Sequence, residues 1–289
     1  MKALVTGANG QLGYELRRTV PDACQALFTT RQDIEICDQE AVLEFVSDAQ
    51  PDIIINAAAY TAVDGAETKP DLAVAVNAEA PGYLARAAER CGARLIHVST
   101  DFVFDGQASD PYTPRDETRP LGVYGHSKLA GECRVREILP LASMVVRTAW
   151  LYSAHGNNFV KTMLRLMAER DELRVVDDQV GSPTWARGLA EAIWALAPHE
   201  EAHGIYHWTD SGRCSWHGFA CEIQSRALEL GLLDRAIEIE AIPTSEYPTP
   251  AQRPAFSVLD LEALESLLGR KAHPWQAQLQ GMLQELREE

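Results

Sequence analysis

Positive charge is scarce in this sequence of 289 residues, which has 26 lysines and arginines against 42 aspartates and glutamates. The net charge of −16 argues against nucleic acid and against anionic membranes as partners, because both carry the same sign of charge. An anionic ligand would therefore need a local group of donors within an acidic protein.

Paired cysteines and long apolar runs are also lacking. The six cysteines form no C-x-x-C pair, which predicts reduced thiols rather than a disulfide framework. No apolar run approaches the length of a membrane span, and Met1-Lys2 leads directly into a predicted strand. We therefore expect no signal peptide and no membrane partner, and a cytoplasmic location.

The strongest local pattern lies in the first sixteen residues. An apolar run at 3–5 leads into Gly7, Gly10 and Gly13, and a helical pattern follows. Gly7 would permit a tight turn, Gly10 would let a pyrophosphate approach the backbone, and Gly13 would let the helix pack closely on a sheet. The spacing G-x-x-G-x-x-G is one residue longer than the usual dinucleotide fingerprint. An ordinary strand–turn–helix is the alternative, but the position between a strand and a helix favours nucleotide binding.

Strands and helices alternate through the first half of the chain. This alternation predicts an α/β fold with a doubly wound, Rossmann-like parallel sheet. Ligands bind such sheets beyond the carboxyl ends of the strands. The predicted strands cover 26–29, 52–56, 95–98 and 144–146, and the predicted helices cover 40–49, 70–90 and 124–138.

The second half is less regular and richer in proline. We expect residues 1–150, joined by about 184–210, to form a dinucleotide-binding domain, and 151–183 with 211–289 to form a smaller substrate lobe. Helices are predicted at 157–170, 185–196, 216–230, 259–268 and 274–286, and strands at 173–176, 204–208 and 237–242.

Tyr124 and Lys128 form a Y-x-x-x-K pair, which lies on one face of a helix. An ammonium near the phenol would lower its pKa from about 10, so that the pair could transfer a proton near neutral pH. Thr100, at the end of a predicted strand, could hydrogen-bond the same carbonyl oxygen. A solvated Tyr and Lys would be the simpler interpretation of an isolated pair, but the glycine turn and the strands before it favour carbonyl reduction.

The tip of the second strand carries Arg31 and no acid. An arginine at this position can pair with a ribose 2′-phosphate, so we predict NADPH as the cofactor, with NADH possible because Glu35 lies nearby.

Several longer motifs resemble the extended short-chain dehydrogenases/reductases, and within them the dTDP-4-dehydrorhamnose reductase family. The motifs occur in the order found in that family. They are GANGQLG at 7–13, NAAAYTAVDGAE at 56–67, STDFVFDG at 99–106, VYGHSKLAGE at 123–132, RTAWLY at 147–152, GNNFVKTMLRL at 156–166 and DDQVGSPT at 177–184.

The resemblance implies NAD(P)H-dependent reduction of the C4 keto group of dTDP-4-dehydro-L-rhamnose to dTDP-L-rhamnose. It implies Thr100, Tyr124 and Lys128 as the catalytic set. The cofactor residues that it implies, with those of the turn, are Gly7, Gly10, Gln11, Leu12, Gly13, Arg31, Glu35, Ile36, Ala59, Tyr60 and Thr61. The implied substrate residues are Thr100, Asp101, Trp150, Asn158 and Arg253, with packing at a strand end and helix capping as alternatives for Trp150 and Asn158.

Three alternatives belong to related proteins. A nucleotide-sugar 4,6-dehydratase would carry an Asp-Glu pair, but here Phe102 follows Asp101. A nucleotide-sugar epimerase shares the Y-x-x-x-K pair and differs only in the finer motifs. A non-catalytic regulatory subunit, like that of methionine adenosyltransferase, resembles the same reductases, although an intact Thr100, Tyr124 and Lys128 favour catalysis.

Some reductases of this kind pair through a magnesium site made by carboxylates. Glu15 matches one such position, but Arg187 stands where another carboxylate would be needed and would repel the ion. We therefore expect no metal site, a monomer or a metal-independent homodimer, and a solvated first-turn role for Glu15.

Overall fold

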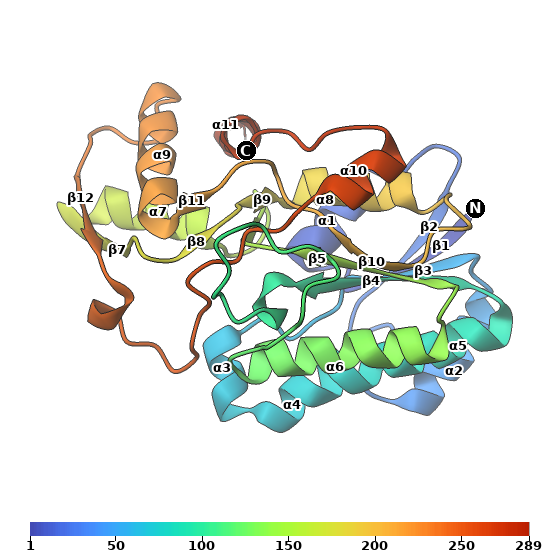
Figure 1. The fold of residues 1–289 in the computed structure, drawn as a ribbon. Helices are drawn as coiled ribbons and strands as arrows, with labels where there is room; N and C mark the ends of the chain where they lie inside the picture. The colour runs from blue at the N-terminus through green and yellow to red at the C-terminus, as the bar shows by residue number, and fades with distance from the viewer. Residues whose placement is uncertain (289) are drawn as a thin grey trace.

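A parallel sheet of six strands forms the centre of the computed structural model, which describes residues 1–288 (Figure 1). Its spatial order is β10-β5-β4-β3-β1-β2, and every ladder is parallel. The chain passes from β1 to β2 on one side and returns to β3 on the other, so the strand order reverses beside β1. The predicted doubly wound sheet is confirmed. The strands are β1 (Lys2–Thr6), β2 (Gln25–Thr29), β3 (Ile53–Asn56), β4 (Arg94–Thr100), β5 (Ser143–Thr148) and β10 (Gly204–His207).

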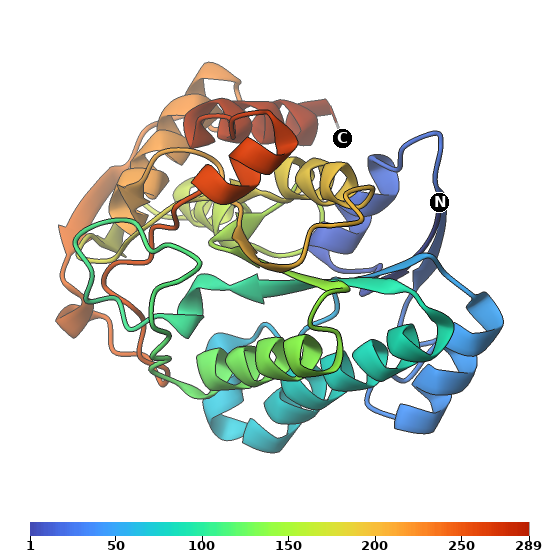
Figure 2. The same ribbon diagram turned by 45° about the vertical axis from the view of Figure 1, so that its right-hand side comes forward.

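Helices cover both faces of this sheet, which explains why its inner strands β1, β3, β4 and β5 are buried along nearly their whole length (Figure 2). Ala3 and Val5 point to the face of one helical layer, and Leu4 points to the other, as the strand alternation requires. The first layer contains α1 (Gln11–Arg18), α8 (Ala186–Leu196) and α10 (Glu262–Leu268). The second contains α2 (Gln39–Ala49), α5 (Ala80–Cys91) and α6 (Val123–Ile138).

A second hydrophobic core lies beyond the carboxyl end of the sheet and includes Phe219 and Trp275. Around it lie α7 (Phe159–Glu169), α9 (Trp216–Glu229), α11 (Trp275–Glu288) and a parallel pair of β7 (Glu172–Val176) and β12 (Glu238–Ile242). Two further pairs are β6 (Leu151–Tyr152) with β9 (Thr184–Trp185) and β8 (Val180–Gly181) with β11 (Cys214–Ser215). None of the helices within residues 1–288 is long and apolar enough to cross a membrane.

The helix predicted over 70–90 is divided in the structure into α4 (Pro70–Val74), a π-helical turn (Ala75–Glu79) and α5. Pro81 has no N–H for the carbonyl of Asn77, four residues earlier, so regular α-helical bonding fails at this point. The prediction also missed α3 (Val63–Thr68), which is too short to show a helical period. The helix predicted from residue 259 begins at Glu262 instead. Short 3₁₀ turns at Asp101–Val103 and Thr244–Glu246 complete the elements.

Candidate active site

The loop between β1 and α1 requires glycine at two positions, Gly7 and Gly13. Gly7 has a φ of +75°, and a Cβ atom on Gly13 would lie 2.2 Å from the Gly7 carbonyl oxygen. The loop closes where the Gly10 N–H donates to the Gly7 carbonyl at 3.0 Å. A Cβ on Gly10 would lie 3.3 Å from the Gly7 carbonyl oxygen, a tight but less severe contact than at Gly13, and Gly10 lines the cavity beside the turn. The turn therefore fits a pyrophosphate at the N-terminus of α1.

A cavity of about 450 Å³ opens beside this turn, at the point where the strand order reverses. Of the predicted cofactor residues, the cavity is lined by Gly7, Gly10, Arg31, Glu35, Ile36 and Ala59. Leu12 does not line the cavity, because it is buried in the hydrophobic core between the sheet and the layer of α1 and α8. The backbone of Tyr60 is held at both its N–H and its carbonyl by the buried side chain of Asn77, at 2.8 and 3.0 Å. Asn77 was not among the residues predicted from the sequence. The sequence feature that could have pointed to Asn77 is Pro81, four residues later, which interrupts regular helical bonding at Asn77.

Thr100 and Tyr124 meet at the carboxyl edge of the sheet. Thr100 ends β4, and Tyr124 lies in the first turn of α6, close enough for the Thr100 side chain to lower the pKa of the Tyr124 hydroxyl. The Phe102 ring packs edge-on against Tyr124, with centroids 5.5 Å apart. A Cβ on Gly125 would lie 2.2 Å from the Phe102 carbonyl oxygen, so this glycine permits the close approach of α6 to β4. The structure thus brings the predicted proton donor and its hydroxyl partner together.

Lys128 is buried one turn further along α6, and its Nζ donates to the Val98 carbonyl at 2.7 Å. Burial lowers the pKa of Lys128 to about 8, against the opposing effect of Glu132. Burial raises the pKa of Tyr124 to about 12, although the Thr100 hydrogen bond opposes this rise. The prediction that Lys128 lowers the pKa of Tyr124 is therefore wrong for this structure, because the ammonium is bonded to a strand carbonyl instead.

A buried ion pair behind the lysine was missed in the sequence. Glu132 accepts from Nε and Nη2 of Arg147 at 2.9 and 2.7 Å and from the Ser99 hydroxyl at 2.5 Å. All three side chains are buried. The spacing could have drawn attention to Glu132, because Tyr124, Lys128 and Glu132 follow one another at intervals of four residues and so lie on one face of α6. The pair attaches α6 to β5 and to the residue next to Thr100.

A second cavity of about 650 Å³ lies in the part of the chain around α7, β7 and β12, and Trp216 and Arg253 line it. Trp150 has a φ of +46°, and its ring stacks on that of Trp216 at 3.5 Å between centroids. The Arg253 guanidinium forms a fork with Asp64 of α3, at 3.1 and 2.8 Å. This hydrogen bond holds the pKa of Asp64 below its usual value, and Asp64 was another residue that the sequence analysis missed.

Of the other predicted substrate residues, Thr100 lies beside Tyr124, and neither Asp101 nor Asn158 lines the cavity. Asp101 is buried beside Thr100, whose hydroxyl donates to it at 3.0 Å, and burial raises the pKa of Asp101 to about 6. Asn158 caps α7, where its Oδ1 accepts from the Lys161 N–H at 3.1 Å. The capping alternative considered for Asn158 is thus realised.

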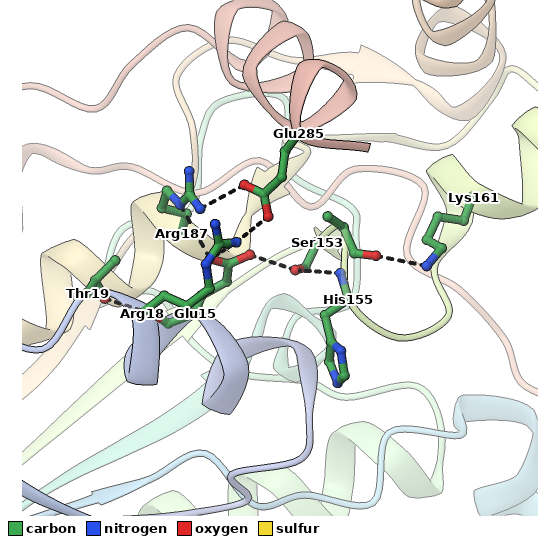
Figure 3. A network of polar contacts seen from close by, with 9 residues as sticks. Glu15, Arg18, Thr19, Ser153, His155, Lys161, Arg187 and Glu285 are labelled. Atoms are coloured by element: carbon green, nitrogen blue, oxygen red, sulfur yellow. Dashed lines mark hydrogen bonds and ion pairs between the residues drawn. The ribbon is translucent and has the colours of Figure 1, made fainter. Parts of the chain in front are cut away.

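Glu15 differs most from its prediction, because its side chain is fully buried rather than solvated. Its Oε2 lies 3.4 Å from Nε of Arg187 and 3.6 Å from Nη1 of Arg18, and both arginines also pair with Glu285 of α11 (Figure 3). The Arg187–Glu285 distance is 2.7 Å. Four charges of zero net sum therefore join α1, α8 and α11. The packing of α8 and α11 over α1 excludes the solvent that a surface helix would give Glu15.

The parallel sheet, the glycine turn where its order reverses and the Tyr–Lys helix beside a strand-end threonine define the class of short-chain dehydrogenases/reductases. Within this class, the chain belongs to the family described as RmlD substrate binding domain, whose model matches residues 1–288. It is 46% identical over 285 residues to the dTDP-4-dehydrorhamnose reductase of Burkholderia thailandensis, with 95% of each chain covered.

Solved structures of similar proteins give the same result. A dTDP-4-dehydrorhamnose reductase from Clostridium acetobutylicum superposes with a TM-score of 0.93 at 41% identity, covering 99% of this chain and 100% of that one. The dTDP-4-dehydrorhamnose reductase of Bacillus anthracis, solved in complex with NADP, superposes with a TM-score of 0.92 at 37% identity, covering 98% and 99%.

Proposed function

We propose that this chain reduces the C4 keto group of dTDP-4-dehydro-L-rhamnose to give dTDP-L-rhamnose, with NADPH as the reductant. The observation that carries the proposal is the placement of Tyr124, at the start of α6, beside Thr100 at the end of β4, with buried Lys128 one turn further along α6. The substrate is supported by relatives of nearly the same length whose name is dTDP-4-dehydrorhamnose reductase, and the cofactor by the NADP in one of their structures.

In this reaction, bound NADPH supplies a hydride to the carbonyl carbon. Tyr124, protonated over the whole physiological range with a pKa of about 12, donates its phenolic proton to the oxygen that becomes the C4 hydroxyl. The Thr100 hydroxyl hydrogen-bonds the same oxygen, and Lys128, with a pKa of about 8, supplies a nearby ammonium when the phenolate forms. One hydride and one proton then account for the alcohol.

We assign the two binding tasks to different parts of the chain. Residues 1–150 with about 184–210 bind the dinucleotide in the cavity beside the glycine turn. Gln11, Tyr60 and Thr61 do not line this cavity but directly follow the lining residues Gly10 and Ala59 in the chain, and we assign them to the same dinucleotide site. Residues 151–183 and 211–289 bind the nucleotide sugar, where Trp150 and Arg253 serve the cavity that Trp216 lines. Asp101 orients the Thr100 hydroxyl by accepting its hydrogen bond.

Reduction fits better than the alternatives from related enzymes. The position after Asp101 holds Phe102, whose ring packs on Tyr124, so the second carboxylate of a dehydratase has no place there. The identity of 46% to a named reductase favours reduction over epimerisation. The deciding experiment follows NADPH oxidation by the purified chain with dTDP-4-keto-6-deoxy sugar. Oxidation with formation of the 4-hydroxy sugar supports the proposal. A rearranged sugar without net NADPH oxidation would indicate epimerisation. The absence of both oxidation and product would indicate a regulatory protein.

The cofactor preference gives a prediction for Arg31. The nearby acids are already engaged, since Glu35 accepts from the Cys37 N–H at 3.1 Å and Asp33 accepts from the Thr30 N–H at 2.8 Å. We expect Arg31→Ala to lower kcat/KM for NADPH roughly 10- to 100-fold and to leave NADH little changed, because a charge-assisted hydrogen bond contributes about 1.5–3 kcal/mol. Arg115→Ala, an exposed arginine in the loop before α6, is the control. A wild-type preference for NADH of tenfold or more would refute the assignment.

For assembly, we propose a monomer or a homodimer that needs no metal, acting in the cytoplasm. Arg187 already provides the positive charge between Glu15 and Glu285, and the six cysteines are free thiols, as in a reducing compartment. We expect the sedimentation coefficient to be the same in magnesium and in EDTA. A dimer that dissociates on chelation would contradict this proposal.

A further inference from the structure

A short loop from the second part of the chain, residues 153–158, reaches back to the glycine turn. The His155 ring stacks on Tyr14 of α1, with centroids 4.4 Å apart and planes inclined by 9°. Its Nε2 donates to the carbonyl of Asn9 at 3.2 Å. Asn9 comes directly before Gly10, so this contact holds one side of the turn.

Asn158 holds the other side of the turn. Its Nδ2 donates to Oε1 of Gln11 at 2.9 Å and to the carbonyl of Ser153 at 2.7 Å, while its Oδ1 caps α7. An amide nitrogen carries two hydrogens, so these two bonds use both of them. The side chain therefore has no donor left for a nucleotide sugar.

The first residues of the loop are held by further hydrogen bonds (Figure 3). The buried Ser153 hydroxyl donates to Oε1 of Glu15 at 2.7 Å and accepts the His155 N–H at 3.1 Å. The ammonium of Lys161, in α7, donates to the Ala154 carbonyl at 2.8 Å. Glu15 is in turn held by Arg187, so the loop is attached to α1, α7 and α8 together.

We propose that residues 153–158 form a clasp that holds the glycine turn in the shape that binds the dinucleotide, with His155 and Asn158 as positioning residues. This proposal rests on the proposed function for the identity of the cofactor. The clasp contacts the Asn9 carbonyl and the Gln11 side chain, one on each side of Gly10, and so restrains the turn before a pyrophosphate binds. Because the turn is already ordered in the free protein, less conformational entropy is lost when the dinucleotide binds. Asn158 thereby acts on the cofactor side of the enzyme and makes no contact with the substrate.

Two variants separate this role from a substrate contact. Asn158→Ser retains an oxygen that can cap α7 but removes the two amide N–H groups that bond Gln11 and Ser153. His155→Phe retains the stack on Tyr14 but removes the bond to Asn9. We expect each variant to raise the Kd for NADPH, titrated without substrate, roughly 3- to 30-fold, the equivalent of one or two hydrogen bonds. The Kd for dTDP and the kcat at saturating NADPH should stay within about twofold, since neither residue touches the reacting atoms.

Asn157→Ser provides the matched control, because Asn157 is the exposed neighbour of the same type. A weaker affinity of Asn158→Ser for dTDP with unchanged affinity for NADPH would overturn the proposal and make Asn158 a substrate contact. Unchanged NADPH affinity in His155→Phe would overturn the clasp as well, whether or not Asn158→Ser folds. A wild-type protein that binds NADPH but reduces no keto sugar would contradict the proposed function and leave the clasp intact.

Discussion

Replacing Tyr124 with phenylalanine is expected to lower kcat roughly 10²- to 10⁴-fold, the usual contribution of a general acid. Phenylalanine keeps the ring that packs edge-on against Phe102 but has no proton for the C4 oxygen. The loss should therefore lie in kcat, measured from NADPH oxidation at saturating keto sugar, and the melting temperature should change little. Tyr83→Phe, which removes a hydroxyl from a tyrosine packed at the edge of the core, is the control.

The same variant also tests the role of the threonine. If turnover remained near the wild-type value, Tyr124 would have no part in proton transfer, and Thr100 would be left as the only hydroxyl of the pair. A large fall in kcat accompanied by a lower melting temperature would instead indicate a packing defect, and would have to be corrected by comparing folded fractions.

Replacing Arg147 with methionine is expected to destabilise the protein by about 3–5 kcal/mol, because it leaves the Glu132 carboxylate buried without its partner. The expected effect is large because the pair is bidentate and almost fully inaccessible to water. The free energy of unfolding in urea measures it. Arg165→Met breaks an exposed pair with Glu169 on α7 and should change stability by less than about 1 kcal/mol.

The double variant Glu132→Gln with Arg147→Met completes this experiment. Removing both charges relieves the unpaired carboxylate, so the double variant should regain part of the stability that Arg147→Met loses. If Arg147→Met alone cost less than about 1 kcal/mol, solvent or another cation would have to reach Glu132, contrary to its burial in the structure.

The sheet and the glycine turn could be predicted because their signals are local. Continuous apolar runs mark buried parallel strands, and at residues 7 and 13 only glycine fits the turn that joins β1 to α1. Thr100 could be placed at the site because it ends a strand, and ligands bind beyond the carboxyl ends of parallel strands. Tyr124 could be placed there from the Y-x-x-x-K spacing on the helix that follows.

The failures share a different cause, which is that they depend on what lies opposite a residue. Glu15 has the sequence context of a surface acid, and only the packing of α8 and α11 over it makes it buried. The pKa of Tyr124 depends on where the Lys128 ammonium points, and no spacing shows that it turns to the Val98 carbonyl. Asp64 could not be linked to Arg253 from the sequence, since 189 positions separate them.

The ring of Glu15, Arg18, Arg187 and Glu285 constrains how this family member can diverge. An acidic residue at position 187 would place three carboxylates together with only Arg18 to balance them, and loss of Glu15 alone would leave Arg187 without one of its two partners. A single substitution at one of these positions therefore leaves the ring with an uncompensated charge, whereas two matched substitutions keep its net charge at zero. Positions 15, 187 and 285 should accordingly be inherited as one unit, with substitutions at one of them accompanied by substitutions at the others.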